Sequence, residues 1–400
     1  MLTDIADPAL WPGGADRIAW ARRFMPVLNA LSVPAQTEGG LDLDGWRIGL
    51  VLVLEPKTAN LALALRDAGA EVIVHCPGRE TSDDVAAALV RSGVSVLARS
   101  GTTRAEDDDL ARRMLDAGLD ALVDDGARVI RLAHAEERLG PLRGAAEETT
   151  SGLRPLRVMA AQGDLRVPVI AVNDARCKVL FDNVHGTGQS CVMAALDLSG
   201  LELDGLTCVV AGYGHVGQGV ARYAAALGAQ VVVSEVNPFA ALRAFHDGLR
   251  VLPLLDACPQ ADLLFSATGV AGTVTAEHVA ALRPGAYVAV AGGVEDEVER
   301  PPGGREVRPG VTDHGGWYLL AEGECVNCAA AEGNPIEIMD LSLSLQALAV
   351  AHLLASRLPP GVHPLPEELD ERVARLKLDA LGVRLDRPTD RQRAFLGRGL

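Results

Sequence analysis

The feature that most constrains this chain is a glycine-rich turn between a predicted strand and a predicted helix. Residues 207–211 (TCVVA) form a short apolar run typical of a buried strand, and a helical pattern continues to about residue 227. The turn between them reads Gly212-Tyr213-Gly214-His215-Val216-Gly217. Glycines in this GxGxxG spacing allow a tight turn and a close approach of the backbone to a phosphate at the helix N-terminus. The sequence therefore predicts one unit of a Rossmann sheet here.

An acidic residue at the end of the next strand indicates which dinucleotide would bind. The predicted strand 229–234 ends at Glu235, and no arginine stands beside it. A carboxylate at this place accepts hydrogen bonds from ribose hydroxyls, whereas a 2′-phosphate would call for an arginine. The pattern predicts NAD as the cofactor, and the same fold without a cofactor is the alternative. The predicted contacts are Gly212, Gly214, His215, Val216, Gly217 and Glu235.

The first half of the chain alternates apolar strands with amphipathic helices. Predicted strands at 47–53, 71–75 and 94–98 are separated by predicted helices at 57–69 and 83–93. This alternation is typical of a parallel sheet covered by helices on both faces. We therefore expect an α/β fold with two doubly wound parallel-sheet domains, one of them the Rossmann NAD-binding domain, and a small C-terminal helical tail.

Composition excludes several classes of partner. Lys and Arg total 37 against 53 Asp and Glu, for a net charge of -16, so a nucleic acid or an anionic membrane surface is not expected as a partner. Apolar runs such as 48–54 are too short to span a bilayer, and the N-terminus lacks the features of a signal peptide. Seven cysteines in 400 residues form no disulfide framework. We expect a cytoplasmic protein with reduced thiols and no metal site.

Three further segments resemble one family in their order and spacing. They are Glu147-Glu148-Thr149-Thr150-Ser151-Gly152, the stretch 172–183 (VNDARCKVLFDN), and 321–327 (AEGECVN). Together they resemble S-adenosylhomocysteine hydrolases, from about residue 24 to the C-terminal tail. The segments 186–190 (GTGQS) and 335–340 (PIEIMD) are similar to the short archaeal and thermophilic branch.

The resemblance implies how the chain divides and what it binds. Residues 1–182 plus 335–366 would form the substrate-binding domain, 183–334 the NAD-binding domain, and 367–400 the tail. The substrate would be a small-molecule nucleoside. The family is usually tetrameric, so a homo-oligomer, tetramer or dimer, is expected.

The family's chemistry assigns roles to four residues. Oxidation of a nucleoside 3′-hydroxyl makes the C4′ hydrogen acidic, so that a thiol can leave from C5′. By resemblance, Lys178 takes the 3′-hydroxyl proton with Asp182 beside it, Glu148 binds the ribose hydroxyls, and Asp125 lies near C4′ and C5′. A surface lysine and acids that cap helices or turns are the alternatives.

Further positions match the family's cofactor and substrate contacts. Those toward the nicotinamide and its ribose are Thr149, Thr150, Ser151, Asn183, Thr268, Gly292 and Asn327. Those toward the nucleoside are Glu55, Lys57, Thr58, Asn334 and Met339. An ammonium at Lys57 would donate to a 6-oxo purine better than to a 6-amino one. The alternative is that Lys57 begins a helix and points to solvent.

The sequence departs from the family at three histidines. Leu52-Val53, Gly292-Gly293-Val294 and Gly333-Asn334-Pro335 stand where the family has Leu-His, Gly-His-Phe and Gly-His-Pro. Since each lost acid–base group typically costs about 10²–10⁴-fold in rate, we expect a paralogue that diverges in the nucleoside pocket. It would oxidise a purine nucleoside at C3′ as a tailoring step in natural-product synthesis. The alternatives are an authentic hydrolase of S-adenosyl- or S-inosyl-homocysteine and an inactive regulator that binds NAD and nucleoside.

Overall fold

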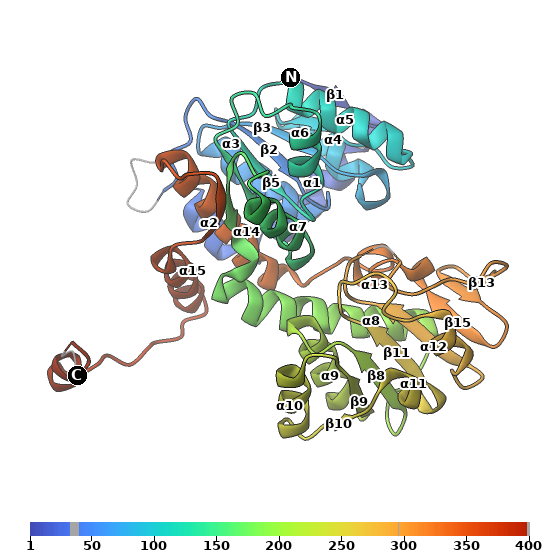
Figure 1. Ribbon diagram of the computed structural model, residues 1–400. Coiled ribbons are helices and arrows are strands. Elements are labelled where there is room, and N and C mark those ends of the chain that lie inside the picture. The colour runs from blue at the N-terminus through green and yellow to red at the C-terminus, as the bar shows by residue number, and fades with distance from the viewer. Residues whose placement is uncertain (33–39, 295, 398–400) are drawn as a thin grey trace.

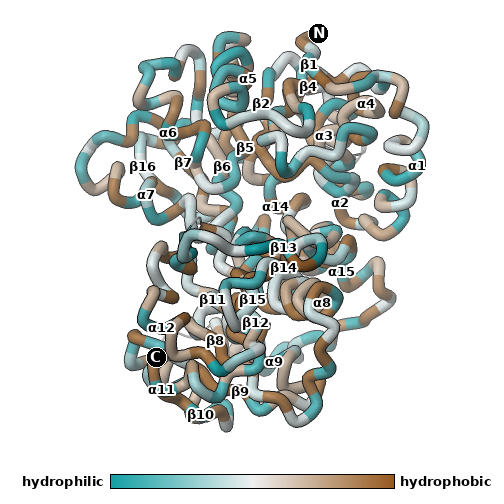
Figure 2. The backbone as a smooth tube through the Cα atoms, turned by 90° about the vertical axis from the view of Figure 1, so that its right-hand side faces the viewer, coloured by the Kyte–Doolittle hydropathy of each residue, from teal (hydrophilic) through white to brown (hydrophobic). Residues whose placement is uncertain are grey.

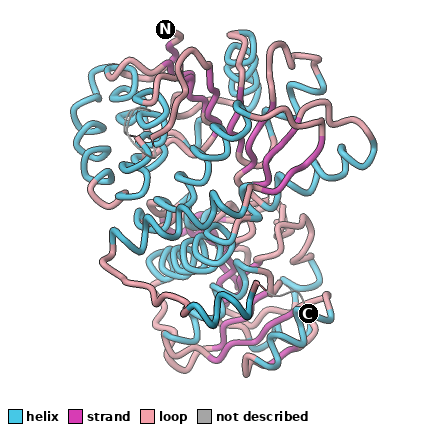
Figure 3. Tube along the Cα trace, turned by 90° about the vertical axis from the view of Figure 1, so that its left-hand side faces the viewer, coloured by secondary structure: helices cyan, strands magenta, loops and turns pink. Residues whose placement is uncertain are grey.

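The computed structural model describes residues 1–32, 40–294 and 296–397, and these form two eight-stranded sheets with helices around each (Figure 1). Residues 33–39 of the predicted substrate-binding domain, 295 of the NAD-binding domain and 398–400 of the tail lie outside the described residues. The predicted α/β fold class is confirmed, because both sheets are mainly parallel and helices lie between and beside the two sets of strands (Figure 3).

The first sheet is parallel throughout and has the order β1-β4-β3-β2-β5-β6-β7-β16. Its strands are β1 Thr3–Asp4, β2 Arg47–Val51, β3 Glu71–His75, β4 Ser95–Leu97, β5 Ala121–Asp124, β6 Gly144–Glu147, β7 Pro168–Ala171 and β16 Gly361–Pro364. The surrounding helices are α1 Trp11–Arg22, α2 Pro26–Leu31, α3 Pro56–Asp67, α4 Asp83–Arg91, α5 Arg104–Asp116, α6 Arg128–Ala135, α7 Thr150–Gln162 and α14 Ile336–Ala355. Short helices η1 Pro8–Leu10, η2 Gly78–Glu80 and η3 Val172–Asp174 complete this part. The central strands are buried on both faces, as expected for continuous apolar runs in a parallel sheet.

The second sheet has the order β10-β9-β8-β11-β12-β15-β14-β13. Its strands are β8 Thr207–Ala211, β9 Gln230–Ser234, β10 Arg250–Val251, β11 Leu263–Ser266, β12 Ala286–Val290, β13 Arg305–Arg308, β14 Val311–Asp313 and β15 Trp317–Leu320. Its helices are α8 Gly188–Ser199, α9 His215–Ala226, α10 Pro238–His246, α11 Leu254–Ala257, η5 Cys258–Gln260, α12 Ala276–Ala280, η6 Ala321–Gly323 and α13 Val326–Ala329. The strands β13 and β14 pair antiparallel at one edge, an addition to the parallel sheet that the sequence pattern did not predict.

The chain returns to the first sheet through α14, which lies near the middle of the molecule (Figure 2). This helix is long and apolar enough to cross a membrane, yet its most apolar window is 72% buried inside the protein. It packs against β5, β6, α2 and α3, so it is a core helix of the first sheet. The chain then adds β16 to the sheet edge, parallel to β7.

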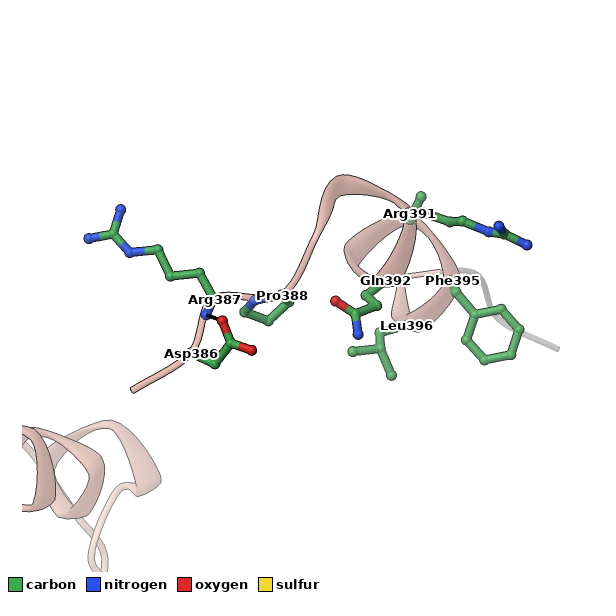
Figure 4. A pocket seen from close by; sticks show the side chains of 8 residues that line it. Asp386, Arg387, Pro388, Arg391, Gln392, Phe395 and Leu396 are labelled. Atoms are coloured by element: carbon green, nitrogen blue, oxygen red, sulfur yellow. Dashed lines mark hydrogen bonds between the residues drawn. The ribbon is translucent and has the colours of Figure 1, made fainter. Parts of the chain in front are cut away.

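The C-terminal segment has two parts that differ in packing. Helix α15 (Glu367–Ala380) packs on α14 and α2, and its Asp370 accepts hydrogen bonds from the backbone N–H groups of Arg176 and Cys177. Helix α16 (Asp390–Leu396) is exposed and extends away from both sheets (Figure 1). Side chains of residues 386–396 alone line a shallow concavity there (Figure 4), which lies apart from the segments predicted to bind substrate.

A continuous helical connector joins the two sheets. It begins as the π-helix η4 (Lys178–Thr187) and continues as α8. Side-chain contacts also join the two parts: Arg154 of α7 donates to the Gly269 carbonyl at 2.7 Å, and Arg79 Nη1 lies 2.6 Å from Glu324 Oε1. The predicted catalytic residues therefore lie at the edge of the first sheet that is nearer to the second sheet.

Candidate active site

The glycine-rich turn has the shape that its sequence predicted. Gly212 has φ +97°, in the region that glycine favours, and a Cβ added at Gly217 would lie 2.0 Å from the Gly212 carbonyl oxygen. A Cβ added at Gly214 would meet nothing within 4 Å, so this glycine borders open space. The turn is thus tightly packed on one side and accessible on the other, and this fits the close approach of a dinucleotide phosphate.

The acid after β9 is tied to the same turn. Glu235 Oε2 accepts a hydrogen bond from the backbone N–H of Tyr213 at 2.7 Å, and Oε1 accepts from the N–H of Asn237 at 2.9 Å. His215 and Val216 begin α9, and burial lowers the pKa of His215, which favours a neutral imidazole. Glu235 is therefore held beside the glycine-rich turn, where a carboxylate would accept hydrogen bonds from the ribose hydroxyls of a dinucleotide.

Two other predicted cofactor contacts follow the next strands of the second sheet. Thr268 lies after β11, and its hydroxyl is within 2.5 Å of the Thr273 hydroxyl. Gly292 lies after β12, where an added Cβ would fall 2.0 Å from Glu297 Oε1. Because β8, β11 and β12 are parallel, these positions lie at the same sheet edge as the glycine-rich turn. Folds of this type bind their ligands at that edge, where the strands have their carboxyl ends.

The first sheet contributes a buried lysine held between two carboxylates. Lys178, on the first turn of η4, is 6% exposed; its ammonium contacts Asp182 and lies 3.1 Å from Glu148 Oε1. Glu148 follows β6 and also accepts a hydrogen bond from Gln346 of α14. The structure therefore brings together three of the four residues predicted to be catalytic, and none of the three is a surface residue.

The charges around Lys178 set its protonation state. Burial lowers the pKa of Lys178, but the Asp182 and Glu148 carboxylates outweigh burial, so the net pKa is raised. Burial likewise raises the pKa of Glu148, although Lys178 opposes it. Without substrate, Lys178 is therefore charged. A role as base requires that the lysine lose its proton once the ribose hydroxyls and a cationic ring change this environment.

Asp182 is the centre of a buried hydrogen-bond network. Its carboxylate accepts hydrogen bonds from Lys178, from the Asn334 amide and from the Ser342 hydroxyl of α14. Asn334 also donates to Thr187 at 3.1 Å. Asn334, predicted to contact substrate, is thus engaged with the protein, and it occupies the place where the resemblance led us to expect a histidine.

The network continues toward the predicted nicotinamide contacts. The Asn327 amide donates to Asn334 Oδ1 at 2.8 Å and to the Ser190 hydroxyl at 3.0 Å. Asn183 donates to Asn173 at 3.2 Å from the next turn of η4. Asn327 and Asn183 are both buried, and Asn327 is linked to Asp182 through Asn334, so predicted cofactor and catalytic residues share one hydrogen-bond network.

Asp125 and Thr149 lie at the ends of the neighbouring strands β5 and β6. Asp125 is partly exposed, and burial together with the charge of Glu80 raises its pKa to about 6. The Thr149 hydroxyl caps α7, accepts from the Gly126 N–H at 3.1 Å and donates to Glu147 at 2.8 Å. Thr149 therefore shapes the Asp125 loop. Thr150 is exposed at the start of α7, and the Ser151 hydroxyl donates to Thr149.

The predicted purine contacts lie at the start of α3. Glu55 caps the helix by accepting from the backbone N–H groups of Lys57 and Thr58, at 2.9 and 3.4 Å. Lys57 is 4% exposed, and its ammonium donates to the Glu332 carbonyl at 2.8 Å and lies 2.9 Å from Glu55 Oε2. The alternative that Lys57 points to solvent is therefore wrong. Met339, on α14, packs against the core of the first sheet.

Several residues of the site were not predicted from the sequence. Ser342 and Gln346 reach Asp182 and Glu148 from α14, and Glu80 influences Asp125 from η2. The spacing of Ser342 and Gln346, four residues apart in a mostly apolar helix, places both on one face and could have indicated their role. No cluster of three or more His, Cys, Asp or Glu side chains with metal-binding geometry occurs among the described residues.

The fold and the site define a class: two-domain α/β proteins with one Rossmann-type sheet and a buried lysine–carboxylate cluster on the connector. Within that class, the chain belongs to the S-adenosyl-L-homocysteine hydrolase family, whose model matches residues 3–141 and 133–399. An S-inosyl-L-homocysteine hydrolase of Methanopyrus kandleri is 42% identical over 98% of this chain and 96% of its own length. An adenosylhomocysteinase of Thermotoga maritima is 42% identical over 96% of this chain and 98% of its own length.

These relatives favour one of the functions predicted from the sequence. An adenosylhomocysteinase of Archaeoglobus fulgidus, 42% identical over 96% of this chain and 98% of its own length, extends the set. The predicted family is confirmed, together with its archaeal and thermophilic relatives, and the chain is an enzyme of this family. Since these relatives are named as hydrolases, they favour the authentic hydrolase over the divergent natural-product enzyme, for which they give no support.

Proposed function

We propose that this enzyme uses tightly bound NAD to hydrolyse a nucleoside–homocysteine thioether to the free nucleoside and homocysteine. The observation that carries the proposal is the buried Lys178 between Asp182 and Glu148, on the connector that packs against α9. Burying a lysine with two acids costs desolvation free energy, and buried charged clusters of this kind concentrate at functional sites. The glycine-rich turn at the start of α9, with its open face at Gly214, supports NAD as the cofactor.

The chain's own residues account for the first step. Bound NAD supplies the acceptor for the hydride from C3′ and returns it at the end of the cycle. Glu148 accepts hydrogen bonds from the ribose hydroxyls, which weakens its hold on Lys178. Lys178 gives its own proton to solvent and then takes the 3′-hydroxyl proton, and Asp182, fixed by Asn334 and Ser342, holds the ammonium that forms.

The later steps need acid–base groups near C4′ and C5′. The C4′ proton, made acidic by the 3′-ketone, leaves, and the C5′–S bond breaks with its electron pair on sulfur. Water then adds at C5′ and a proton returns to C4′, so atoms and electrons balance without a net oxidation. Asp125 lies at the adjacent strand end and supports these proton transfers.

The buried Lys57 supports a 6-oxo purine as the base. An ammonium has three N–H donors, and two of them face Glu55 and the Glu332 carbonyl. The remaining donor suits a carbonyl oxygen at purine C6, and a 6-amino group would place donor against donor. We therefore propose S-inosyl-homocysteine ahead of S-adenosyl-homocysteine as the substrate.

Two substrates and one residue test the proposal. Purified enzyme is incubated with each thioether, and free homocysteine is measured with a thiol reagent. Lys178→Arg keeps the charge but removes the base, so we expect release to fall by about 10²-fold or more, whereas Arg176→Ala, an exposed neighbour, should leave release unchanged. Equal release by Lys178→Arg and wild type would refute the proposed role of the lysine. No release from either thioether by wild type would refute the hydrolase.

A homo-oligomer, tetramer or dimer, and a cytoplasmic location remain predictions. Exposed apolar side chains on and beside α10 support self-association, among them Val236, Phe239 and Phe245. Light scattering on the purified protein tests the oligomeric state.

A further inference from the structure

A buried glutamate that the proposed mechanism does not use joins the ends of two strands in the second sheet. Glu297 is fully buried, and its Oε2 accepts hydrogen bonds from the hydroxyl of Ser266, the last residue of β11, at 2.6 Å and from the Thr268 N–H at 3.4 Å. Its Oε1 accepts from the N–H of Val294, beyond β12, at 3.4 Å. Glu297 therefore holds together the loops that follow β11 and β12.

The strand order places one half of a dinucleotide over these two loops. The order of the second sheet reverses between β8 and β11, and a dinucleotide binds across such a reversal with its pyrophosphate at the turn after the first strand. Glu235, after β9, lies on the side of β8 where the ribose of the adenosine half binds. The nicotinamide half is therefore expected on the other side, over the ends of β11 and β12.

The loops that Glu297 joins border the cleft between the two domains. Arg154, from α7 of the first domain, donates to the carbonyls of Thr268 and Gly269 at 3.1 and 2.7 Å. A Cβ added at Gly292 would lie 2.0 Å from Glu297 Oε1, so the carboxylate packs directly against the backbone of Gly292. Since Thr268 and Gly292 are both predicted cofactor contacts, Glu297 lies immediately behind this part of the cofactor site.

The contacts of Glu297 give it hydrogen bonds but no positive charge. All the hydrogen bonds that the described residues make to its carboxylate come from hydroxyl or backbone N–H groups, which suits an ionised carboxylate because it only accepts. Burial raises the pKa of Glu297, and these donors oppose the effect of burial. A nearby cation would therefore stabilise the buried charge. The oxidised nicotinamide ring is a cation, whereas the reduced ring is neutral.

We propose that the charge of Glu297 makes this site favour the oxidised form of the bound cofactor over the reduced form. This inference rests on the proposed function, because it takes NAD as the cofactor. No bond forms or breaks at Glu297, and its carboxylate acts only through its field, which is stronger in a buried site than at the surface. Because the stored hydride must return to C3′ at the end of each cycle, such a charge favours that return.

Glu297→Gln tests the proposal, because it removes the charge and keeps the shape, and its amide oxygen can still accept from Ser266. The holoenzyme is equilibrated without substrate in a fixed mixture of NAD⁺ and NADH, until the bound ratio no longer changes. Gel filtration then removes free cofactor, and the bound forms are released and measured by chromatography. Mildly alkaline buffer keeps Glu297 ionised in wild type despite its raised pKa.

We expect the ratio of bound NAD⁺ to bound NADH to be about tenfold lower in Glu297→Gln than in wild type, a change of about 1.4 kcal/mol. Glu299→Gln is the matched control, because it removes the same charge from an exposed side chain two residues further along. Its ratio should equal that of wild type. A purely structural role of Glu297 would weaken the binding of both forms and leave the ratio unchanged.

The outcomes separate this inference from the proposed function. A ratio in Glu297→Gln equal to that of wild type overturns the inference alone, whether or not total cofactor falls. If Glu297→Gln does not fold, Glu297→Met removes the charge without burying an amide, and its ratio decides in the same way. Wild-type protein that retains neither form of the cofactor overturns both the inference and the proposed use of NAD.

Discussion

Asp182→Asn should lower the pKa of Lys178 while leaving the lysine side chain in place. Of the two carboxylates near Lys178, Asp182 acts on it more strongly than Glu148. Removal of an opposite charge at this range lowers a lysine pKa by about 1–3, which corresponds to about 1.4–4 kcal/mol less preference for the charged form. The asparagine keeps the volume and can still contact Asn334 and Ser342.

Asp182→Asn should reduce the stability of the fold but increase the fraction of Lys178 that is neutral at a given pH. Lys178 has a raised pKa in the folded protein, so its ion pairs stabilise the fold fully below the unfolded pKa, and this stability is lost only as pH rises through the folded pKa. Asp182→Asn should therefore lower the free energy of unfolding at neutral and acid pH. The rising limb of the pH–rate profile, in which Lys178 loses its proton, should move to lower pH by about 1–3.

The assay is the rate at which bound cofactor becomes reduced after substrate is mixed with enzyme, followed by absorbance across the pH range. Asp174→Asn is the matched control, because Asp174 is a half-exposed carboxylate that pairs with Arg157 on the surface. If the rising limb of the pH–rate profile lies at the same pH in Asp182→Asn and wild type, the charge of Asp182 does not set the pKa of Lys178, and the proposed role of Asp182 is wrong.

Two further predictions address the cofactor turn and the core. Gly214→Ala should keep the thermal stability of wild type but lose bound cofactor on gel filtration, because the added Cβ meets no protein atom and fills the open face of the turn. Gly217→Ala should lose both stability and cofactor, because its Cβ would lie 2.0 Å from a carbonyl oxygen. Intact cofactor content in Gly214→Ala would contradict the binding role of that face. Asp340→Ala leaves the partly buried Lys377 and the Val27 and Leu28 N–H groups without their acceptor, and should cost about 3–5 kcal/mol in urea denaturation. Asp379→Ala, exposed on α15, should cost almost nothing.

Local patterns predicted the parts of the fold that local interactions decide. The strands β2, β3 and β8 are continuous apolar runs, and the GxGxxG turn needs glycine for reasons that act within six residues. The return of α14 and β16 to the first sheet depends on contacts between residues more than a hundred positions apart, as between β16 and β7. In the antiparallel pair β13–β14, strand β13 is exposed and mostly charged and β14 is only three residues long, so no apolar pattern marked the pair.

In the site too, local motifs could be predicted from the sequence and contacts between distant residues could not. The sequence indicated Lys178, Asp182 and Glu148 through the motifs around them, but the contact of Asn334 with Asp182 joins positions 152 residues apart. Lys57 is buried because the Glu332 backbone and Glu55 supply its partners, and a helix start alone cannot reveal this. Glu80 stands in a turn with no periodic pattern, so only the three-dimensional arrangement places it near Asp125.

The connector has a consequence for how the enzyme turns over. Lys178, Asp182 and Asn183 lie on η4, the segment through which the first domain passes into the second, and Asn334 lies where the chain passes back. Any rotation of one domain against the other must bend one of these two crossings, and so must displace the base or its anchor. If Lys178 is the base that we propose, a change in the angle between the domains would alter the contact between Asp182 and Asn334 that holds it. The rate of the first chemical step would then depend on the angle between the domains.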